Sequence, residues 1–304
     1  MDRWLVKSFG YPQSGWIDLK STHMTKYEFL YKLTRSKAAL VNITLIPGET
    51  YYFFLKELSS KLKIKEEVLF NTYNKLAYKK DGNILPQTYS LPIGMSANDT
   101  IKYLFEYTNN QYKKYSMKIY NSYNKENWYN YIRIASIIQK ESASKEEMSK
   151  ISSVIYNRLE KNMKLQMDGT LNYGKYSHTK ITPKMIRNNH TSYNTYKNKG
   201  IPRDPICAVE FSAIKAAIHP LKTTYLYFVK SKDGTKHIFT ASYKSHKNNI
   251  NKLRKYNKKK RIQKKKTYKK RKNTVKKIKK KKLLKTNQKN KSKKQIKDLW
   301  KSVY

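Results

Sequence analysis

The nine residues from 134 to 142 read Ile134-Ala135-Ser136-Ile137-Ile138-Gln139-Lys140-Glu141-Ser142 and end a strongly apolar run. A period of 3.6 residues predicts a core-facing helix here. Its apolar stripe consists of Tyr131, Ile134, Ala135 and Ile138. Glu141 extends this stripe, so we expect its carboxyl to be partly removed from water, which favours the protonated form. Glu141 is therefore a candidate general acid; the alternative is a helix-end glutamate that turns out to solvent.

A second helix is expected directly after the first. The residues Ser144-Lys145-Glu146-Glu147 have the pattern of a capping box. The helix that this box predicts carries an apolar stripe made of Met148, Ile151, Ile155 and Leu159. Glu141 would then lie at the junction of two helices, which is a rigid place for a catalytic group.

The remaining pattern predicts a mixture of short strands and helices. Upstream, residues 1–24 are expected to be irregular or strand-like, and residues 25–28 form another capping box. Further strands are expected over 41–45 and 87–91, and helices over 51–61, over 65–78 and after Ser96. Downstream, a helix is expected over 210–218, followed by a hairpin whose strands, 224–229 and 237–240, are joined by a turn at Asp233-Gly234.

The composition limits the class of protein. The chain has 304 residues, which suffice for one large or two ordinary domains. Its single cysteine, Cys207, excludes an intrachain disulfide. The six histidines are scattered, and none pairs with Cys207 or with another histidine at helical separation, so we expect neither a metal nor a cofactor.

The formal net charge of +47 is unevenly distributed. Residues 251–304 contain 27 Lys and Arg residues and one acidic residue, Asp298. Such a block of like charge stays solvated, and we expect a disordered or helical Lys-rich tail. A nucleic-acid-binding protein is one alternative that this charge supports. Against it, the tail has few aromatic residues for base stacking, namely Tyr256 and Tyr268.

No targeting or membrane-spanning segment is visible in the sequence. The first seven residues, Met1–Lys7, lack the apolar core of a signal peptide. No later stretch approaches the ~20 apolar residues that a spanning helix needs.

Two polar segments follow the helix pair. Residues 165–170 read Leu-Gln-Met-Asp-Gly-Thr, and residues 192–196 read Ser-Tyr-Asn-Thr-Tyr. Side-chain amides can bond sugar hydroxyls and tyrosine rings can stack on pyranose faces, so these segments suit a glycan. The alternative is a surface loop with ordinary turn residues.

These motifs, in this order and spacing, resemble those of the YceG-like family, the endolytic murein transglycosylases. The resemblance is strong from about Trp128 to Ile250. It is carried by residues 135–141, 157–159, 165–170, 193–196, 200–202, 205–206, 216–220 and 225–229. It is weaker over 40–125, where residues 46–50 and 85–89 resemble parts of the family's LysM-like module.

The resemblance implies an α+β fold with a LysM-like module (40–125) followed by a catalytic domain with a C-terminal hairpin (126–250). An N-terminal segment (1–39) precedes these two parts, and the Lys-rich tail (251–304) follows them. It also implies a lyase that cleaves nascent peptidoglycan strands internally without water and leaves 1,6-anhydromuramyl ends. By the resemblance Glu141 is the catalytic residue. The residues expected to line the glycan groove are Asn157, Gln166, Thr170, Tyr193 and Asn194, with Asp168 orienting substrate or serving structure.

The expected partners are peptidoglycan strands, with peptidoglycan synthases as further candidates and anionic lipid or wall polymer for the tail. No specific nucleic acid is expected, and a non-catalytic peptidoglycan-binding module remains an alternative. The resemblance implies a place on the extracytoplasmic face of the inner membrane. Members of the family usually carry an N-terminal membrane anchor, and none is visible in this sequence. The Lys-rich tail of this sequence is not part of the family pattern.

Overall fold

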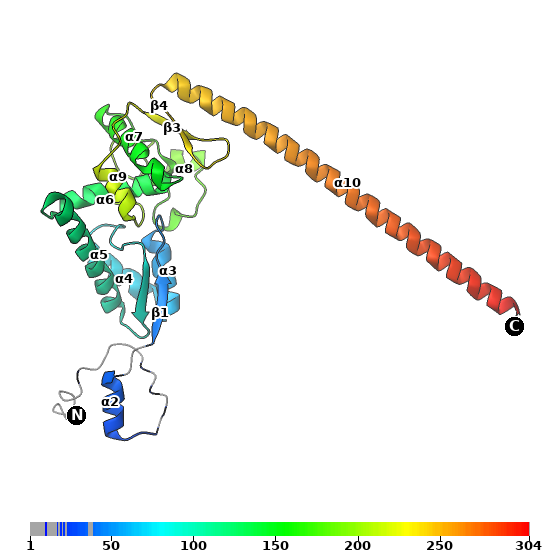
Figure 1. The fold of residues 1–304 in the computed structure, drawn as a ribbon, viewed down its shortest axis with the longest axis horizontal. Helices are drawn as coiled ribbons and strands as arrows, with labels where there is room; N and C mark the ends of the chain where they lie inside the picture. Colours follow the sequence, from blue (N-terminus) through cyan, green and yellow to red (C-terminus); the bar gives the residue numbers. More distant parts are fainter. Residues whose placement is uncertain are drawn as a thin grey trace.

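A computed structural model describes residues 10, 17, 19, 21, 23–35 and 39–303, and the side chains of part of the C-terminal helix. The predicted irregular or strand-like segment 1–24 lies mostly outside these residues. Helices dominate the described part, and the strands form two small antiparallel sheets (Figure 1). The α+β prediction is confirmed.

The first helix of the described residues, α2 (Lys26–Arg35), begins at the predicted capping box. The backbone N–H of Thr25 donates to Glu28 Oε2 at 2.8 Å, and the backbone N–H of Glu28 donates to Thr25 Oγ1 at 3.2 Å. Two of the N–H groups that a helix start leaves without backbone partners are thereby satisfied.

The next elements surround a first hydrophobic core. Strand β1 (Leu40–Thr44) pairs with β2 (Thr88–Pro92) antiparallel, in the register Asn42 to Ser90. Helices α3 (Tyr51–Leu62), α4 (Glu66–Leu76) and α5 (Ala97–Tyr120) pack beside this pair (Figure 1). The predicted cap of α5 is present, because Ser96 Oγ accepts from the backbone N–H of Asp99. The core includes the fully buried side chains Ile43, Leu55, Leu58, Leu69 and Ile101.

A second hydrophobic core lies among α6 (Lys125–Glu141), α7 (Met148–Glu160) and α9 (Phe211–Ile218). The apolar stripe predicted for α6 faces it: Ala135 and Ile138 are fully buried, and Ile134 is nearly so. The helix begins at Lys125, where Asn124 Oδ1 accepts from the backbone N–H of Asn127 and caps it.

The two cores meet without a spacer at Gly82, whose φ is 75°. A Cβ at this position would lie 2.8 Å from Ile132 Cγ2 and 3.0 Å from Pro205 Cγ. The Gly82 carbonyl also accepts a hydrogen bond from the Tyr112 hydroxyl at 3.1 Å. Backbone from the first core thus packs directly against side chains of the second, which requires glycine.

The predicted capping box at Ser144 is wrong. Lys145–Glu147 form a short 3₁₀ turn (η1) ahead of α7, and the Ser144 side chain makes no cap hydrogen bond. The Glu147 carboxylate instead accepts from the backbone N–H of His237 at 2.6 Å and pairs with its Nδ1 at 2.9 Å. This buried pair anchors the predicted hairpin, β3 (Tyr227–Lys230) with β4 (His237–Thr240), to the start of α7.

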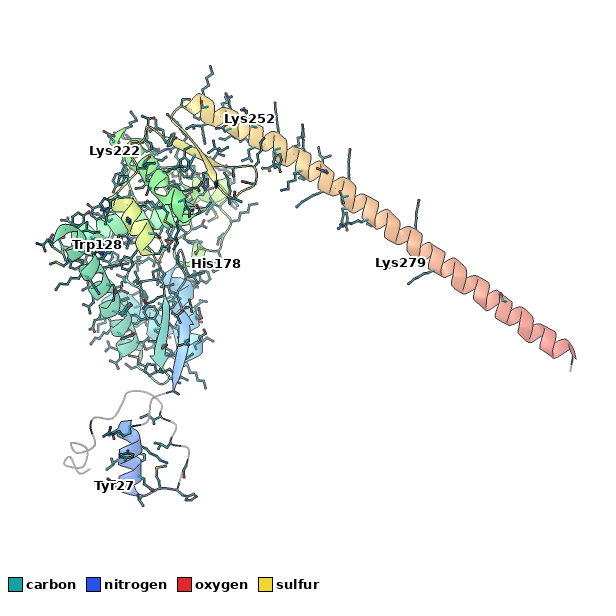
Figure 2. All side chains as sticks on the ribbon, in the orientation of Figure 1. Tyr27, Trp128, His178, Lys222, Lys252 and Lys279 are labelled. Carbon is teal, nitrogen blue, oxygen red and sulfur yellow. The ribbon has the colours of Figure 1, made fainter. Side chains whose placement is uncertain are left out.

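The Lys-rich segment is helical. Helix α10 (Tyr243–Val303) is 61 residues long and begins eight residues before the predicted tail. Its first turns pack on β3 and β4, and the rest projects away from both cores (Figures 1 and 2). Lys252 and Lys279 mark this projecting part in Figure 2. No helix among the described residues combines the length and apolar character needed to cross a bilayer.

Candidate active site

Glu141 is the last residue of α6, and its carboxyl meets the polar segment that follows α7. The backbone N–H of Gly169 donates to Glu141 Oε1 at 2.8 Å. A Cβ on residue 169 would lie 2.8 Å from the same oxygen and 2.8 Å from Lys140 Cβ. Only glycine lets the backbone approach the carboxyl this closely. The glycine of the Asp168-Gly169 pair is therefore needed for the contact with Glu141 as well as for the turn.

The environment of Glu141 raises its pKa to about 7. Removal of the carboxyl from water is the main cause, and the negative charge of Asp168 adds to it. The hydrogen bond from Gly169 acts in the opposite direction and lowers the pKa. In a large fraction of the molecules the Glu141 carboxyl is therefore protonated near neutral pH, as a general acid must be.

A cleft of about 330 Å³ opens in front of Glu141. Its walls are more polar than apolar. They come from α7, from the polar segments 165–170 and 192–196, from the hairpin and from the first turn of α10. The lining residues are Glu141, Arg158, Leu165, Gln166, Met167, Asp168, Tyr196, Tyr227, Phe228, Tyr243 and His246. The structure thus brings three predicted site residues together here, namely Glu141, Gln166 and Asp168.

Asp168 is held in place by a tyrosine. The Tyr196 hydroxyl donates to Asp168 Oδ1 at 2.7 Å, which links the two polar segments across the cleft. Desolvation and the contact with Asp168 raise the pKa of Tyr196, so its hydroxyl stays protonated and remains a donor. The orientation of Asp168 toward the cleft follows from this bond.

The backbone of Gln166 has φ of 52°, a left-handed value that is uncommon for a residue with a side chain. Its N–H donates to the Thr195 carbonyl at 3.1 Å, and the next N–H, of Met167, donates to Thr195 Oγ1 at 3.1 Å. These bonds hold the polar segment in the turn that presents Gln166 and Asp168 to the cleft.

Four predicted site residues do not line this cleft. Thr170 is fully buried and bonds the Met167 carbonyl and Thr195 Oγ1, and Asn194 is fully buried and donates to the carbonyls of Ile186 and Asn189. The amide of Asn157 donates to the carbonyls of Thr223 and Tyr225, ahead of β3. Tyr193 donates to Asp204 and lines a different cavity, described below. Their predicted contact with substrate stays a prediction; the bonds of Thr170, Asn194 and Asn157 hold the walls of the site.

Several lining residues were not among the predicted site residues. Arg158 is 7 % exposed; its Nε donates to the Leu226 carbonyl at 2.6 Å and Nη1 to the Leu165 carbonyl at 2.8 Å. Its guanidinium lies 5.0 Å from the centre of the Tyr227 ring. One buried cation therefore ties the hairpin to the polar segment at the cleft wall.

His246 and Tyr243 bring the basic helix into the site. The His246 ring stacks on Tyr227 at 5.1 Å, and Tyr243 lies 5.9 Å from the same ring. His246 Nδ1 is buried without a hydrogen-bond partner in the described structure. The motif that could have indicated Arg158 is the Asn-Arg-Leu run of α7; nothing in the sequence places the first turn of α10 here.

The sequence model of the YceG-like family matches residues 4–252. The chain belongs to the YceG-like family. A curated relative, the endolytic murein transglycosylase of Bacillus subtilis (strain 168), is 33% identical over 235 residues, which are 73% of this chain and 64% of the relative. A second, the endolytic murein transglycosylase of Streptococcus pneumoniae serotype 2 (strain D39 / NCTC 7466), is 27% identical over 57% of this chain and 32% of the relative.

A solved structure agrees with this assignment. The crystal structure of a YceG-like protein from Listeria monocytogenes superposes with a TM-score of 0.59 at 26% identity, covering 74% of this chain and 81% of that one. The matched region spans less than two thirds of the length of the curated YceG-like relatives named above.

Proposed function

We propose that this chain is an endolytic peptidoglycan lytic transglycosylase, a lyase that cleaves nascent glycan strands and leaves 1,6-anhydromuramyl ends. The observation that carries the proposal is the Glu141 carboxyl, which has a pKa of about 7, is held by Gly169 and faces an open polar cleft. The names of the YceG-like relatives supply the substrate class.

One carboxyl suffices for this reaction. Protonated Glu141 gives its proton to the glycosidic oxygen as the bond to C1 of the muramic acid residue breaks. The resulting carboxylate then takes a proton from the C6 hydroxyl of that sugar as its oxygen attacks C1 and closes the 1,6-anhydro ring. Glu141 ends protonated again, no water is consumed, and the strand is divided into two.

The surrounding groups prepare the carboxyl for both steps. Removal from water keeps the proton on Glu141 before cleavage, and the Gly169 N–H stabilises the carboxylate that forms afterwards. Gln166 and Asp168 face the same cleft and are placed to bond sugar hydroxyl or acetamido groups. We assign Asp168 an orienting role.

Zymography against purified sacculi tests the proposal. The wild-type protein should clear the sacculi, and Glu141→Gln should not. Glu126→Gln, an exposed residue in the first turn of the same helix, is the matched control and should clear them as the wild type does. Mass spectrometry should find 1,6-anhydromuramyl ends; reducing ends alone would make the protein a hydrolase and overturn the mechanism.

The family match does not favour a nucleic-acid-binding protein or a non-catalytic peptidoglycan-binding module. We propose that the domains follow the predicted boundaries, with a LysM-like module over 40–125 and a catalytic domain over 126–250. Action outside the cytoplasm, at the face of the inner membrane and beside peptidoglycan synthases, is the proposed setting, in keeping with the murein substrate that the relatives' names give.

The projecting part of α10 is proposed as a tether to anionic lipid or wall polymer. All 18 side chains described between residues 251 and 268 are exposed or half-exposed, and eight of them are Lys and two are Arg. Each basic residue near an anionic membrane contributes about 1 kcal/mol, which salt weakens. A chain ending at Ile250 should bind anionic vesicles less than the full chain while still cleaving soluble glycan. Unchanged vesicle binding would contradict the proposed tether.

A further inference from the structure

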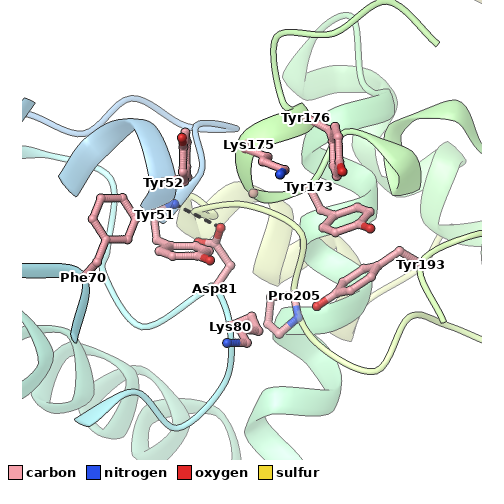
Figure 3. Close-up of a pocket in the computed structure, with 11 residues that line it drawn as sticks. Tyr51, Tyr52, Phe70, Lys80, Asp81, Tyr173, Lys175, Tyr176, Tyr193 and Pro205 are labelled. Carbon is pink, nitrogen blue, oxygen red and sulfur yellow. Dashed lines mark hydrogen bonds between the residues drawn. The ribbon is translucent and has the colours of Figure 1, made fainter. Parts of the chain in front are cut away.

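A second cavity, of about 340 Å³, lies where the two cores meet (Figure 3). We call it the aromatic cleft. Its walls come from the start of α3, from α4, from the loop after α4 and from the segment that follows Asp168. Its lining includes Tyr52, Asp81, Tyr173, Tyr176 and Tyr193.

Flat rings from both cores form its surface (Figure 3). Tyr173 and Tyr193 stack at 3.9 Å with an angle of 13° between their planes, and Tyr176 contacts Tyr173 edge-on at 5.6 Å. From the first core come Tyr52 and Phe70, whose ring centres are 5.4 Å apart. The rings are therefore fixed by one another before any ligand arrives, which lowers the entropic cost of binding.

The polar groups of the aromatic cleft are few and include a fixed carboxyl. Asp81 is 4 % exposed; its Oδ2 accepts from the backbone N–H of Tyr51 at 3.1 Å and its Oδ1 from that of Gly82 at 3.0 Å. Each carboxylate oxygen has two acceptor positions, so further bonds from a ligand hydroxyl or amide can be accepted. Lys80 and Lys175 add two ammonium groups to the lining. A mostly apolar cavity with a few fixed polar groups is typical of a small-ligand site.

The aromatic cleft shares a wall segment with the cleft of Glu141. Residues 165–168 line the cleft of Glu141, and residues 173–176 of the same segment line the aromatic cleft. Lys140, the neighbour of Glu141 on α6, donates through Nζ to Ser177 Oγ at 2.7 Å, directly after this segment. The two clefts are therefore lined by the two ends of one short segment, whose middle residues, 169–171, are buried between them.

We propose that the aromatic cleft is a second glycan subsite, which binds an N-acetylated sugar of the same peptidoglycan strand away from the bond that Glu141 cleaves. The sugar's ring face packs on the tyrosines, and a hydroxyl or acetamido N–H donates to Asp81. The identity of the strand rests on the proposed function. The ammonium groups of Lys80 and Lys175 suit the carboxylates that muramic acid and its stem peptides carry.

Binding is measured on the full-length Glu141→Gln protein, so that the strand is not cut. The ligands are glycan strands that keep their stem peptides, the same strands freed of stem peptides with an amidase, and tetra-N-acetylchitotetraose, each titrated by calorimetry. Adding Tyr52→Ala or Tyr176→Ala should weaken strand binding about five- to tenfold, the loss expected for one stacking ring. Tyr176→Phe keeps the ring and should bind as the parent does. Tyr103→Ala, on α5 and 43% exposed, is the control outside the aromatic cleft.

Unchanged strand binding in both alanine variants, with thermal unfolding like that of the parent, would overturn the subsite. So would a loss seen only with strands that keep their stem peptides, because the occupant would then be peptide. The subsite and the proposed function can fail separately. If the alanine variants lose binding but the wild type never clears sacculi, the subsite stands and the function falls.

Discussion

The cleft of Glu141 and the aromatic cleft each contain one carboxyl whose pKa is raised to about 7, mainly by removal from water. The surroundings of the two carboxyls differ. Glu141 accepts one backbone N–H, from Gly169, and its other oxygen is not bonded by any described protein group. Asp81 accepts two, from Tyr51 at the start of α3 and from Gly82.

This difference supports the proposal that Glu141, and not Asp81, is the reacting carboxyl. Thr50, the N-cap residue of α3, makes no side-chain cap bond, and Asp81 from the loop after α4 supplies the acceptor instead. The bonds that Asp81 makes stabilise a helix end at the junction of the two cores. A raised pKa therefore marks both carboxyls, but only Glu141 combines it with a free oxygen and a polar cleft.

The largest expected effect tests that separation directly. Glu141→Gln keeps the size of the side chain and its hydrogen bond from Gly169 but removes the transferable proton. Cleavage of sacculi should fall by ~10²–10⁴. Asp81→Asn should lower cleavage by no more than about tenfold, the effect of a weakened helix cap and ligand bond. Initial rates of release of soluble fragments compare the two. Equal losses in proteins of equal unfolding temperature would mean that Asp81 takes part in the chemistry.

The next effect concerns the backbone N–H of Gly169, which donates to Glu141. A side chain on residue 169 would disturb this hydrogen bond. In Gly169→Ala the new Cβ would lie 2.8 Å from Glu141 Oε1, so the carboxyl or the backbone must move. We expect about a tenfold or larger loss of activity and ~1–3 kcal/mol of stability. Both are measured on one preparation, by fragment release and by urea unfolding.

Gly200→Ala is the matched control for that variant. Residue 200 has a φ of 81°, which strains any residue with a Cβ, but nothing lies within 4 Å of the position that the Cβ would take. Its unfolding free energy should fall by about 1 kcal/mol with activity retained. A comparable loss of activity in the control would mean that disturbing these loops lowers activity even where no new atom reaches Glu141.

The pH dependence follows from the raised pKa of Glu141. The first step needs the protonated acid, so the rate should fall as pH rises through about 7, by about tenfold per unit beyond it. The expected limb is thus on the alkaline side, and kcat/KM on soluble strands between pH 5 and 9 locates it. A rate that is flat from pH 6 to 9 would contradict the assignment of Glu141 as the acid.

The smallest effect is a shift of that limb. The charge of Asp168 raises the pKa of Glu141, so Asp168→Asn should lower it and move the alkaline limb toward acid. The asparagine Oδ1 can still accept from the Tyr196 hydroxyl, so the local geometry is kept. The displacement should be less than about one pH unit. A limb that stays in place, or moves toward higher pH, would show that Asp168 does not act on Glu141 by its charge.

The sequence predicted what depends on local periodicity. The apolar stripe of α6, the Ser96 cap of α5 and the Asp233-Gly234 hairpin are each encoded within a few residues, and the structure confirms them. The position of Glu141 at the edge of that stripe is likewise encoded within a few residues of sequence. Its raised pKa follows from that position, as predicted.

Contacts between distant segments were beyond local patterns. The Ser144–Glu147 pattern predicted a capping box, but the Glu147 carboxylate pairs instead with His237, which lies 90 residues later in the chain. The same holds for Asp81, which caps a helix that starts 30 residues earlier, and for His246, which reaches the cleft only because α10 packs on the hairpin. These pairings depend on tertiary packing, which a single sequence does not display.

Under the proposed function and tether, helix α10 would also limit where the protein can cut. At 1.5 Å per residue its 61 residues form a rod about 90 Å long, and Tyr243 and His246 at its base are part of the cleft wall. A rod that lies flat along an anionic surface brings its own base to that surface. The scissile bond would then lie within a protein radius of the surface, and older strands deeper in the wall would be out of range. The same rod standing upright would place the cleft tens of ångströms away, so under these proposals the tilt of one helix would select the layer that is cut.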